Sequence, residues 1–304
     1  MSSSSKGSLF LFGCGYSGAE LACQLLAQGW QVHAASRTPE ALAEVLPAVR
    51  FHRFSPASGL ADPQAALDGI THILSTVGPD PQSCPTSGDP ILEAHGDMLA
   101  AHPAWKGYLS ATSVYAEVAG GSVKEDSITA PTSSRGKARL AAETNWRDQC
   151  QAEIFRAAGI YGPGRTVFAS LLAGTAQRID KPGHVFNRIH VEDLAAAIIT
   201  AMANPQRRRI LNLADGAPAP QAEVVSYAAG LLEMSPPPLI AYEKAVLSPM
   251  ARSFWSTSRR VDSRALTETL GYCLRYPDYR CGLVSCLAAE RKAGIIPEAT
   301  EEPA

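Results

Sequence analysis

The first half of the chain alternates short, uninterrupted apolar runs with segments of helical periodicity. Runs that lack polar alternation are typical of parallel strands covered on both faces. Strands are predicted at residues 9–12, 31–37, 51–54, 72–77, 107–115 and 153–158. This order of signals predicts an α/β fold of the Rossmann type, with a doubly wound parallel sheet.

Helical patterns separate these predicted strands. Leu21, Leu25 and Leu26 recur at helical spacing between residues 18 and 29, and Gly29 is suited to close that helix. Further helices are predicted at residues 39–46, with Thr38 as the N-cap, and at 133–149. The stretch 78–90 is rich in Pro, Gly and Ser and is predicted as a loop.

The pattern loosens after residue 164. It predicts a helix from 190 to about 203, a strand at 210–213 and a helix near 221–233. We expect residues 1–164 to form the core. Residues 165–304 are expected to return to that core in part and to form a small C-terminal lobe that binds substrate. Ligands of such folds bind at the carboxyl ends of the strands, where this lobe would lie.

A glycine loop connects the first predicted strand to the first helix. Gly13, Gly15 and Gly18 have the spacing G-x-G-x-x-G, and Tyr16 and Ser17 lie between the last two. In this setting the first glycine allows a tight turn, the second lets a diphosphate approach the backbone, and the third lets helix and strand pack closely. The loop therefore predicts a dinucleotide-binding site with the diphosphate at the start of the helix.

The second predicted strand indicates which dinucleotide binds. NAD-binding proteins usually carry Asp or Glu there, to accept a hydrogen bond from the ribose 2′-hydroxyl. This chain has Ser36 and Arg37 instead, and a guanidinium is suited to a 2′-phosphate. We therefore expect NADP(H), with NAD(H) as the less favoured cofactor, and we expect Thr76, Val77 and Gly78 to lie beside it.

Composition and charge narrow the class of protein. The chain has 304 residues, 46% hydrophobic and 18% charged, with a formal net charge of −2. A near-neutral chain without a basic face argues against nucleic-acid binding, and no apolar stretch reaches the roughly 18 residues of a membrane span. The polar start does not resemble a secretory signal. The seven scattered cysteines indicate free thiols in a cytoplasmic protein without a metal site.

Four short segments together resemble a known family. They are 13–18 (GCGYSG), 109–115 (LSATSVY), 156–164 (RAAGIYGPG) and 187–194 (NRIHVEDL). Their order is similar to that in the extended type of the short-chain dehydrogenase/reductase superfamily, which includes NAD-dependent epimerases and dehydratases of nucleotide sugars. The resemblance covers most of the chain. It implies a seven-stranded Rossmann sheet with a small C-terminal substrate lobe.

The family uses a Ser or Thr, a Tyr and a Lys for its chemistry, and this chain departs from that pattern at all three positions. Ala111 stands at the Ser/Thr position. Alignment on Gly136 and Glu143 places Arg135 at the Tyr position and Arg139 at the Lys position. Because a guanidinium stays protonated, Arg135 cannot exchange protons as a tyrosine does. The chain thus resembles an atypical member that has lost the Tyr-x-x-x-Lys pair.

Other residues near these positions are candidates for the missing polar roles. Ser110, Tyr115, Arg135 and Arg139 are the candidate catalytic residues, with Arg139 also suited to hold ribose hydroxyls or phosphate. Tyr161 belongs to a segment that lines the nicotinamide and substrate side in the family, so we expect it beside the cofactor. The alternative for that segment is a plain turn after a strand.

The resemblance leaves two functions open. One is an NADP(H)-dependent oxidoreductase, or an epimerase/dehydratase-like enzyme, with a non-standard catalytic set. The other is a non-catalytic NADP(H) sensor or scaffold. The family default for the small-molecule ligand is a nucleotide sugar. Members often form homodimers through a helix bundle that includes the helix predicted at 133–149.

The predicted lobe contains a second group of candidate residues. Phe254 and Trp255, with Arg252, Arg259 and Arg260, are suited either to an anionic substrate pocket or to the lobe core with a solvated rim.

Two further residues have ordinary interpretations that we favour. Cys14 lies near a helix N-terminus, where a thiol becomes acidic and oxidation-sensitive, but a small residue also simply fits there. His190 is expected to be a buried histidine with its ring nitrogens satisfied.

Overall fold

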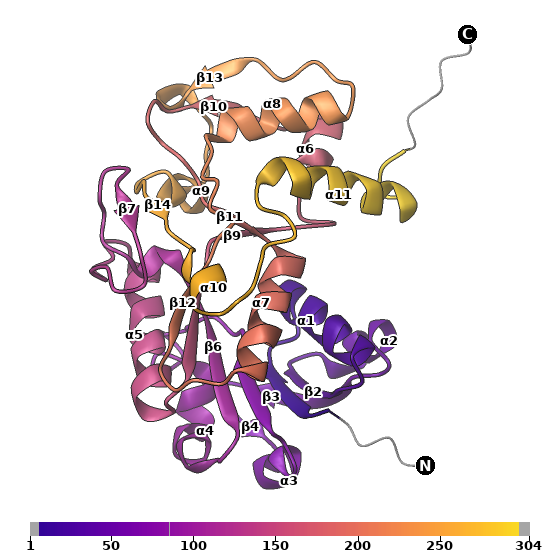
Figure 1. Cartoon of the computed structure of the whole chain (residues 1–304), viewed down its shortest axis with the longest axis vertical. Coiled ribbons are helices and arrows are strands. Elements are labelled where there is room, and N and C mark those ends of the chain that lie inside the picture. Colours follow the sequence, from indigo (N-terminus) through magenta and orange to yellow (C-terminus); the bar gives the residue numbers. More distant parts are fainter. Residues whose placement is uncertain (1–5, 85, 298–304) are drawn as a thin grey trace.

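The computed structural model of the chain describes residues 6–84 and 86–297. In this part of the chain a central sheet lies between two layers of helices, and a smaller lobe stands beyond one end of the sheet (Figure 1). Its eight strands, in spatial order, are β12 (Ile210–Leu213), β8 (Glu153–Ala157), β6 (Trp105–Ala111), β5 (His72–Ser75), β1 (Ser8–Phe12), β2 (Gln31–Ser36), β3 (Arg50–Ser55) and β4 (Gly59–Leu60).

All neighbouring strands of this sheet are parallel except the edge pair β3 and β4, which is antiparallel. The chain enters at β1, adds β2 and β3 on one side, and then crosses to β5, β6 and β8 on the other. This reversal creates a crevice at the carboxyl ends of β1 and β5, which is where such sheets bind ligands. The predicted Rossmann-type α/β fold is confirmed.

Helices cover both faces of the sheet. One face carries α1 (Tyr16–Ala27), α2 (Pro39–Val45), α7 (Val191–Ala203) and α10 (Ala265–Glu268). The other face carries α3 (Pro63–Leu67), α4 (Pro90–Ala101) and α5 (Ser134–Gln149). Each helix contributes apolar side chains to one of two cores, and β1, buried along its whole length, separates those cores.

The lobe is built mainly from residues beyond 164. Its helices are α6 (Phe168–Leu172), α8 (Gln221–Leu231), α9 (Pro249–Phe254) and α11 (Tyr279–Lys292), and α6, α8 and α11 share one apolar cluster. Three two-stranded parallel sheets pair β10 (Arg178–Asp180) with β13 (Leu239–Ala241), β9 (Gly159–Tyr161) with β11 (Arg188–His190), and β7 (Ser122–Val123) with β14 (Arg260–Val261). Through α7 and β12 the same stretch of chain also returns to the core.

Several details differ from the sequence prediction. The sheet has eight strands where the family resemblance implies seven, because the short antiparallel β4 extends it at one edge. Helices α3, α6, α9, α10 and α11 were not predicted. The predicted strand 107–115 ends early, because the chain leaves the sheet after Ala111 and forms a 3₁₀ turn, Thr112–Val114. This turn lets Tyr115 pack into a separate apolar cluster with Val123 and Val261. The helix α4 was not predicted. Its first turn contains a proline, and Asp89 caps it by accepting hydrogen bonds from the backbone of residues 91 and 92.

Candidate functional site

The glycine loop has the geometry that its spacing predicts. Gly13 has φ +88°, a left-handed conformation that favours glycine, and a Cβ there would lie 2.9 Å from Thr76 Oγ1. A Cβ on Gly18 would lie 2.5 Å from the Gly13 carbonyl oxygen, so only glycine lets α1 pack this closely. Gly15 differs, since its φ is −80° and no described atom lies within 4 Å of the place where its Cβ would be.

The open space beside Gly15 is a cavity of about 270 Å³ at the start of α1. Tyr16, Ser17 and Gly18 line it from the first turn of the helix, and Thr76 lines it from the end of β5. No described side chain caps α1, so the backbone N–H groups of its first turn are left for another acceptor. Free N–H groups at the positive end of a helix dipole are suited to bind a diphosphate. We call this space the cofactor cavity, because the sequence predicts a dinucleotide there.

The end of β2 carries the residues expected to select the cofactor. Ser36 is half-buried and its Oγ accepts a hydrogen bond from the Thr38 backbone, while the Arg37 side chain is exposed. The register of the sheet places Arg53 of β3 beside Ser36, and its guanidinium donates to the Arg37 carbonyl at 3.0 Å. Arg53 also pairs with the exposed Glu40 at 2.6 Å. Sequence reasoning missed Arg53, although it follows directly from the pairing of the second and third strands.

The residues after β5 lie under the glycine loop. Thr76 Oγ1 donates to the Gly13 carbonyl at 2.8 Å, and Val77 would touch a Cβ on Gly13. Gly78 lies farther along, on the wall of a second cavity. Of the three residues predicted beside the cofactor, Thr76 lines the cofactor cavity, Val77 packs under the loop, and Gly78 lines the second cavity.

The second cavity, of about 610 Å³, lies between the carboxyl ends of β6 and β8, the start of α5 and a segment of the lobe. We call it the cleft cavity. Ala111, Arg139, Ala157 and Ala158 line both cavities, so the two spaces meet at the ends of β6 and β8. A methyl group thus occupies the junction where the family resemblance implies a polarising hydroxyl.

The two candidate hydroxyls near this junction both have partners inside the protein. Ser110 Oγ donates to Glu143 at 2.6 Å, and Glu143 forms a buried ion pair with Arg156, also at 2.6 Å. Tyr115 is fully buried, and its hydroxyl donates to Asn212 Oδ1 at 2.6 Å. Burial also raises the pKa of Tyr115. Although each residue touches a cavity wall, its oxygen belongs to the buried hydrogen-bond network.

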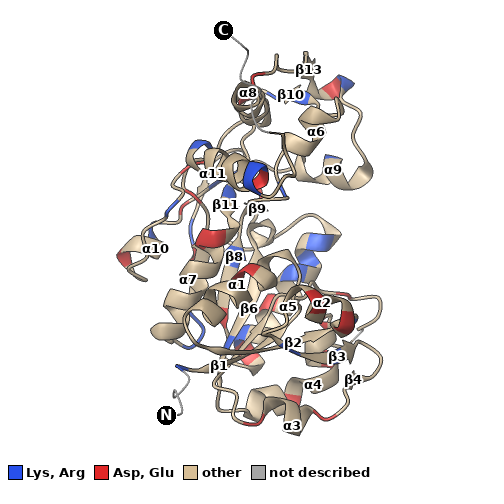
Figure 2. Cartoon of the chain, turned by 90° about the vertical axis from the view of Figure 1, so that its right-hand side faces the viewer, with Lys and Arg blue, Asp and Glu red and all other residues tan. Residues whose placement is uncertain are grey.

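Two of the arginines of α5, Arg135 and Arg139, are on the cleft wall. Arg139 is half-buried, and its Nη1 donates to the Tyr108 hydroxyl at 3.0 Å and to the Leu109 carbonyl at 3.1 Å. Arg135 is exposed and lies 5.5 Å from the ring centroid of Phe254 in α9. Figure 2 shows basic residues gathered at this end of α5, nearest the lobe. The helix that would carry Tyr and Lys in the family presents two guanidinium groups instead.

Tyr161 occupies a different place from the one expected. It is buried beneath α11, where its hydroxyl donates to the Asp278 carbonyl at 3.4 Å, and it is not on the wall of either cavity. Its neighbour Arg165 does line the cofactor cavity and lies over the ring of Tyr16. Tyr16 in turn donates to the Pro163 carbonyl at 3.0 Å. The 162–165 turn therefore contacts the glycine loop through Arg165 and Tyr16. The sequence predicted that Tyr16 lies beside the cofactor, but it did not identify Arg165.

The candidate residues predicted in the lobe, 252, 254, 255, 259 and 260, do not all lie at the cleft cavity. Arg259 and Phe254 line the cleft cavity, whereas Trp255 is buried in the lobe with Ile179 and Ala245. Arg252 stacks over Tyr242 and Arg260 is exposed, and neither lines the cavity. Of the three arginines in the predicted anionic pocket, one lines the cavity. Arg135 and Arg139 of α5 lie on the same wall.

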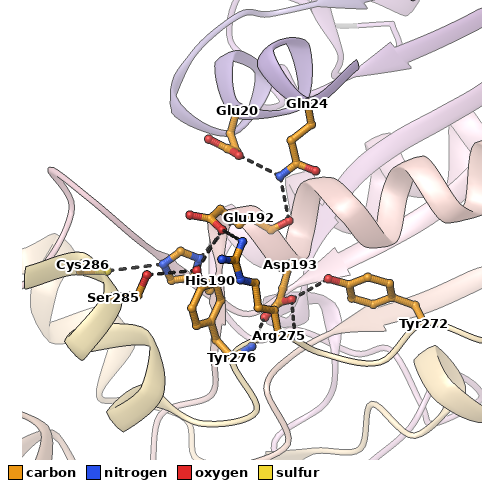
Figure 3. A network of polar contacts seen from close by, with 10 residues as sticks. All are labelled: Glu20, Gln24, His190, Glu192, Asp193, Tyr272, Arg275, Tyr276, Ser285 and Cys286. Atoms are coloured by element: carbon orange, nitrogen blue, oxygen red, sulfur yellow. Dashed lines mark hydrogen bonds and ion pairs between the residues drawn. The ribbon is translucent and has the colours of Figure 1, made fainter. Parts of the chain in front are cut away.

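Cys14 and His190 fit their ordinary interpretations. Burial raises the pKa of the Cys14 thiol to about 11, the opposite of what an oxidation-sensitive thiolate needs. His190 is fully buried, and its Nδ1 accepts from the Glu192 backbone while its Nε2 faces Cys286 Sγ at 3.5 Å (Figure 3). Neither residue reaches the cofactor or cleft cavity through its polar atom.

Comparison with known proteins places this geometry in context. No family model matches the sequence. Protein YeeZ of Escherichia coli K12 is 27% identical over 279 residues, which are 88% of this chain and 96% of that protein. The dTDP-glucose 4,6-dehydratase of Bacillus anthracis, solved in complex with NAD, has a TM-score of 0.72 at 14% identity, covering 94% of this chain and 97% of that one.

The fold is that of the NAD-dependent epimerases and dehydratases, the extended short-chain dehydrogenase/reductases. A conserved protein of unknown function from Silicibacter pomeroyi DSS is much more similar, at 40% identity and a TM-score of 0.86. That match covers 93% of this chain and 99% of the other. The chain belongs to the same family as this conserved protein. Within residues 6–84 and 86–297, no helix is long and apolar enough to cross a membrane.

Proposed function

We propose that this protein binds NADP(H) in the cofactor cavity and acts as an oxidoreductase on a small molecule held in the cleft cavity. The observation that carries the proposal is the open space at Gly15, beside a helix start that no described side chain caps. Structural relatives of the same fold have been solved with NAD. The diphosphate would accept hydrogen bonds from the first turn of α1.

The end of β2 favours NADP(H) over the NAD bound by those relatives. Neither residue 36 nor residue 37 is an acid that could accept from a ribose 2′-hydroxyl. Ser36 and Arg37 offer donors to a 2′-phosphate, and Arg53 adds a second guanidinium beside them. Glu40 pairs with Arg53 and partly offsets its charge, so Arg37 would be the main contact.

The chemistry at the junction of the cavities differs from that of the family. When bound, NADPH would supply a hydride to a carbonyl carbon, and the carbonyl oxygen would need a proton. At the junction Ala111 offers a methyl group and Arg139 a guanidinium, and Arg135 adds a second guanidinium farther out on the cleft wall. A guanidinium holds an oxygen by hydrogen bonds but does not release a proton. The exposed Arg135 marks an opening of the cleft to water, from which the proton would come.

A second function, an NADP(H) sensor, is favoured by one specific observation. The hydroxyls of Ser110 and Tyr115 are both engaged at 2.6 Å within the protein, which leaves the junction without a side chain of the usual proton-transfer type. Incubation with NADPH and a panel of nucleotide sugars and small carbonyl compounds separates the two functions. Turnover supports the oxidoreductase, and NADPH binding without turnover of any compound supports the sensor. Homodimer formation through α5 stays a prediction.

The sharpest test of the site is the substitution Gly15→Ala. The protein should fold normally, because the new methyl meets no described atom within 4 Å and φ is favourable. The methyl enters the space proposed for the diphosphate, so we expect NADPH affinity to fall at least tenfold, about 1.4 kcal/mol. Gly230→Ala is the matched control, since that glycine in α8 is equally open but far from the loop. Equal NADPH affinity for G15A and wild type would contradict the proposal.

A further inference from the structure

Three arginines line the cleft cavity, and they outnumber the acidic residues on its described wall. Arg135, Arg139 and Arg259 are on its wall, and Asp80 is the single acidic residue among the lining residues that the structure describes. None of the three arginines forms an ion pair within the described part of the chain. The cavity is therefore positively charged, which favours a ligand of opposite sign.

Arg259 is the most deeply buried of these three arginines. Only 7% of its surface is exposed. Its Nη1 donates to the Thr112 carbonyl at 2.6 Å, while its Nε has no hydrogen-bond partner among the described residues. By contrast, the buried Arg156 and Arg209 each face a buried glutamate at 2.6 Å. The exposed Glu117 carboxylate acts on Arg259 but forms no ion pair with it. A buried guanidinium without a direct ion-pair partner is destabilising, and a bound anion would supply that partner.

Arg259 is anchored close to the junction of the two cavities. Its anchor, the Thr112 carbonyl, is one residue beyond Ala111, where the two cavities meet. Arg139 is anchored to the Leu109 carbonyl on the other side of Ala111. The two anchors are three residues apart, so about 10 Å of chain separates them. Arg135 lies farther out, over Phe254 at the mouth.

We propose that the cleft cavity binds a small organic anion whose carboxylate or phosphate group is held by Arg259 beside Ala111. The proposal rests on the proposed function only where it assigns the neighbouring cavity to NADP(H). Arg135 adds attraction from the mouth, and Phe186 and Phe254 supply apolar surface for the rest of the molecule. The substrate class is then a small acid or phosphate ester, with its charge close to the carbon that reacts.

Calorimetric titration of the full chain with malonate and with inorganic phosphate tests this proposal. Titrations at constant ionic strength, with and without saturating NADP⁺, should show saturable binding of at least one anion. Malonate binding indicates a carboxylate ligand and phosphate binding a phosphate ester. In Arg259→Gln the affinity should fall at least tenfold. In Arg260→Gln, which removes the same charge from an exposed neighbour, it should stay within twofold.

Three results would overturn the proposal: no binding of either anion to the wild type, equal binding to R259Q, or an equal loss in R260Q. If R259Q does not fold, the exposed Arg135→Gln decides the question. We expect a severalfold loss there, and unchanged affinity counts against the proposal. NADP⁺ is titrated into the same samples. If NADP⁺ does not bind, only the cofactor assignment is contradicted. The titration without NADP⁺ still measures the affinity of the cleft cavity for the anion.

Discussion

At the scale of single residues, the buried network around Glu143 explains why the Ser110 hydroxyl is not free to bind a ligand in the cofactor cavity. Glu143 accepts from Ser110 Oγ and pairs with Arg156, whose guanidinium also lies 4.7 Å from the Tyr115 ring centroid. Removing one member leaves an uncompensated buried charge or donor, which is strongly destabilising. These residues therefore hold the ends of β6, β8 and α5 together below the cavities.

A second buried carboxyl, Asp215, makes stability depend on pH. It is 4% exposed, its Oδ2 has no partner among the described residues, and burial raises its pKa to about 7 against the opposing charge of Arg188. Because the folded protein holds the proton more tightly than the unfolded chain, this contribution is complete below about pH 4. It is lost as the pH rises to 7.

We expect Asp215→Asn to remove this dependence. The amide is neutral at every pH, so the variant should gain about 4 kcal/mol relative to the wild type between pH 4 and pH 8. Urea denaturation at both pH values measures the difference, with the exposed Asp68→Asn as the control. Parallel stability curves for D215N and the wild type would show that Asp215 does not titrate in this range.

The residues of the site differ in how well the sequence predicts them. Gly13 and Gly18 contact each other within one turn, so their spacing alone identifies their roles. Ser110 and Tyr115 find partners 33 and 97 residues away, and no local pattern shows that Glu143 or Asn212 will occupy their hydroxyls. Local geometry is therefore predictable here, and the state of a hydroxyl that depends on distant segments is not.

At the scale of elements, the start of α7 fixes the segment that leads to α11. The buried Asp193 accepts hydrogen bonds from the Tyr272 hydroxyl at 2.6 Å and from the backbone of Arg275 and Tyr276 at 2.8 and 2.9 Å (Figure 3). Glu192 adds a bond from the Tyr276 hydroxyl. One turn of α7 thus holds the connection between the core and the last helix of the lobe.

Asp193→Asn should weaken this connection. The amide keeps one acceptor oxygen but turns an N–H group toward backbone donors, so we expect a loss of about 2–4 kcal/mol in the free energy of unfolding. Faster proteolysis within residues 272–296 should accompany it. Glu223→Gln is the control, because Glu223 is also an acid in the first turn of a helix but is exposed. Wild-type stability in D193N would contradict the role given to Asp193.

The main elements of the core are predictable, and two of the discrepancies have clear physical causes. Short apolar runs identified the strands of the central parallel sheet because covered strands need no polar alternation. Helix α4, which follows the Pro- and Gly-rich stretch 78–90, was missed, although Asp89 followed by Pro90 is an ordinary helix start. The end of β6 was missed because the turn after Ala111 is set by where Tyr115 packs, which is a tertiary contact.

At the scale of the whole molecule, the core and the lobe enclose one continuous site. The cofactor cavity lies at the start of α1, the cleft cavity lies under the lobe, and Ala111 lines both. The fold resembles that of the epimerases and dehydratases. Two adjoining cavities suit a cofactor and a second ligand held next to each other. The identity of the cofactor is the property of this site that can be measured most directly.

Calorimetric titration of the wild-type protein with NADPH and with NADH tests the proposed cofactor most directly. We expect NADPH to bind at least tenfold more tightly, because Arg37 and Ser36 would contact the 2′-phosphate. The preference should disappear in Arg37→Gln and persist in Arg50→Gln, which removes an exposed charge at the opposite end of β3. Equal affinity for the two nucleotides, a preference for NADH, or no binding of either would contradict the proposal.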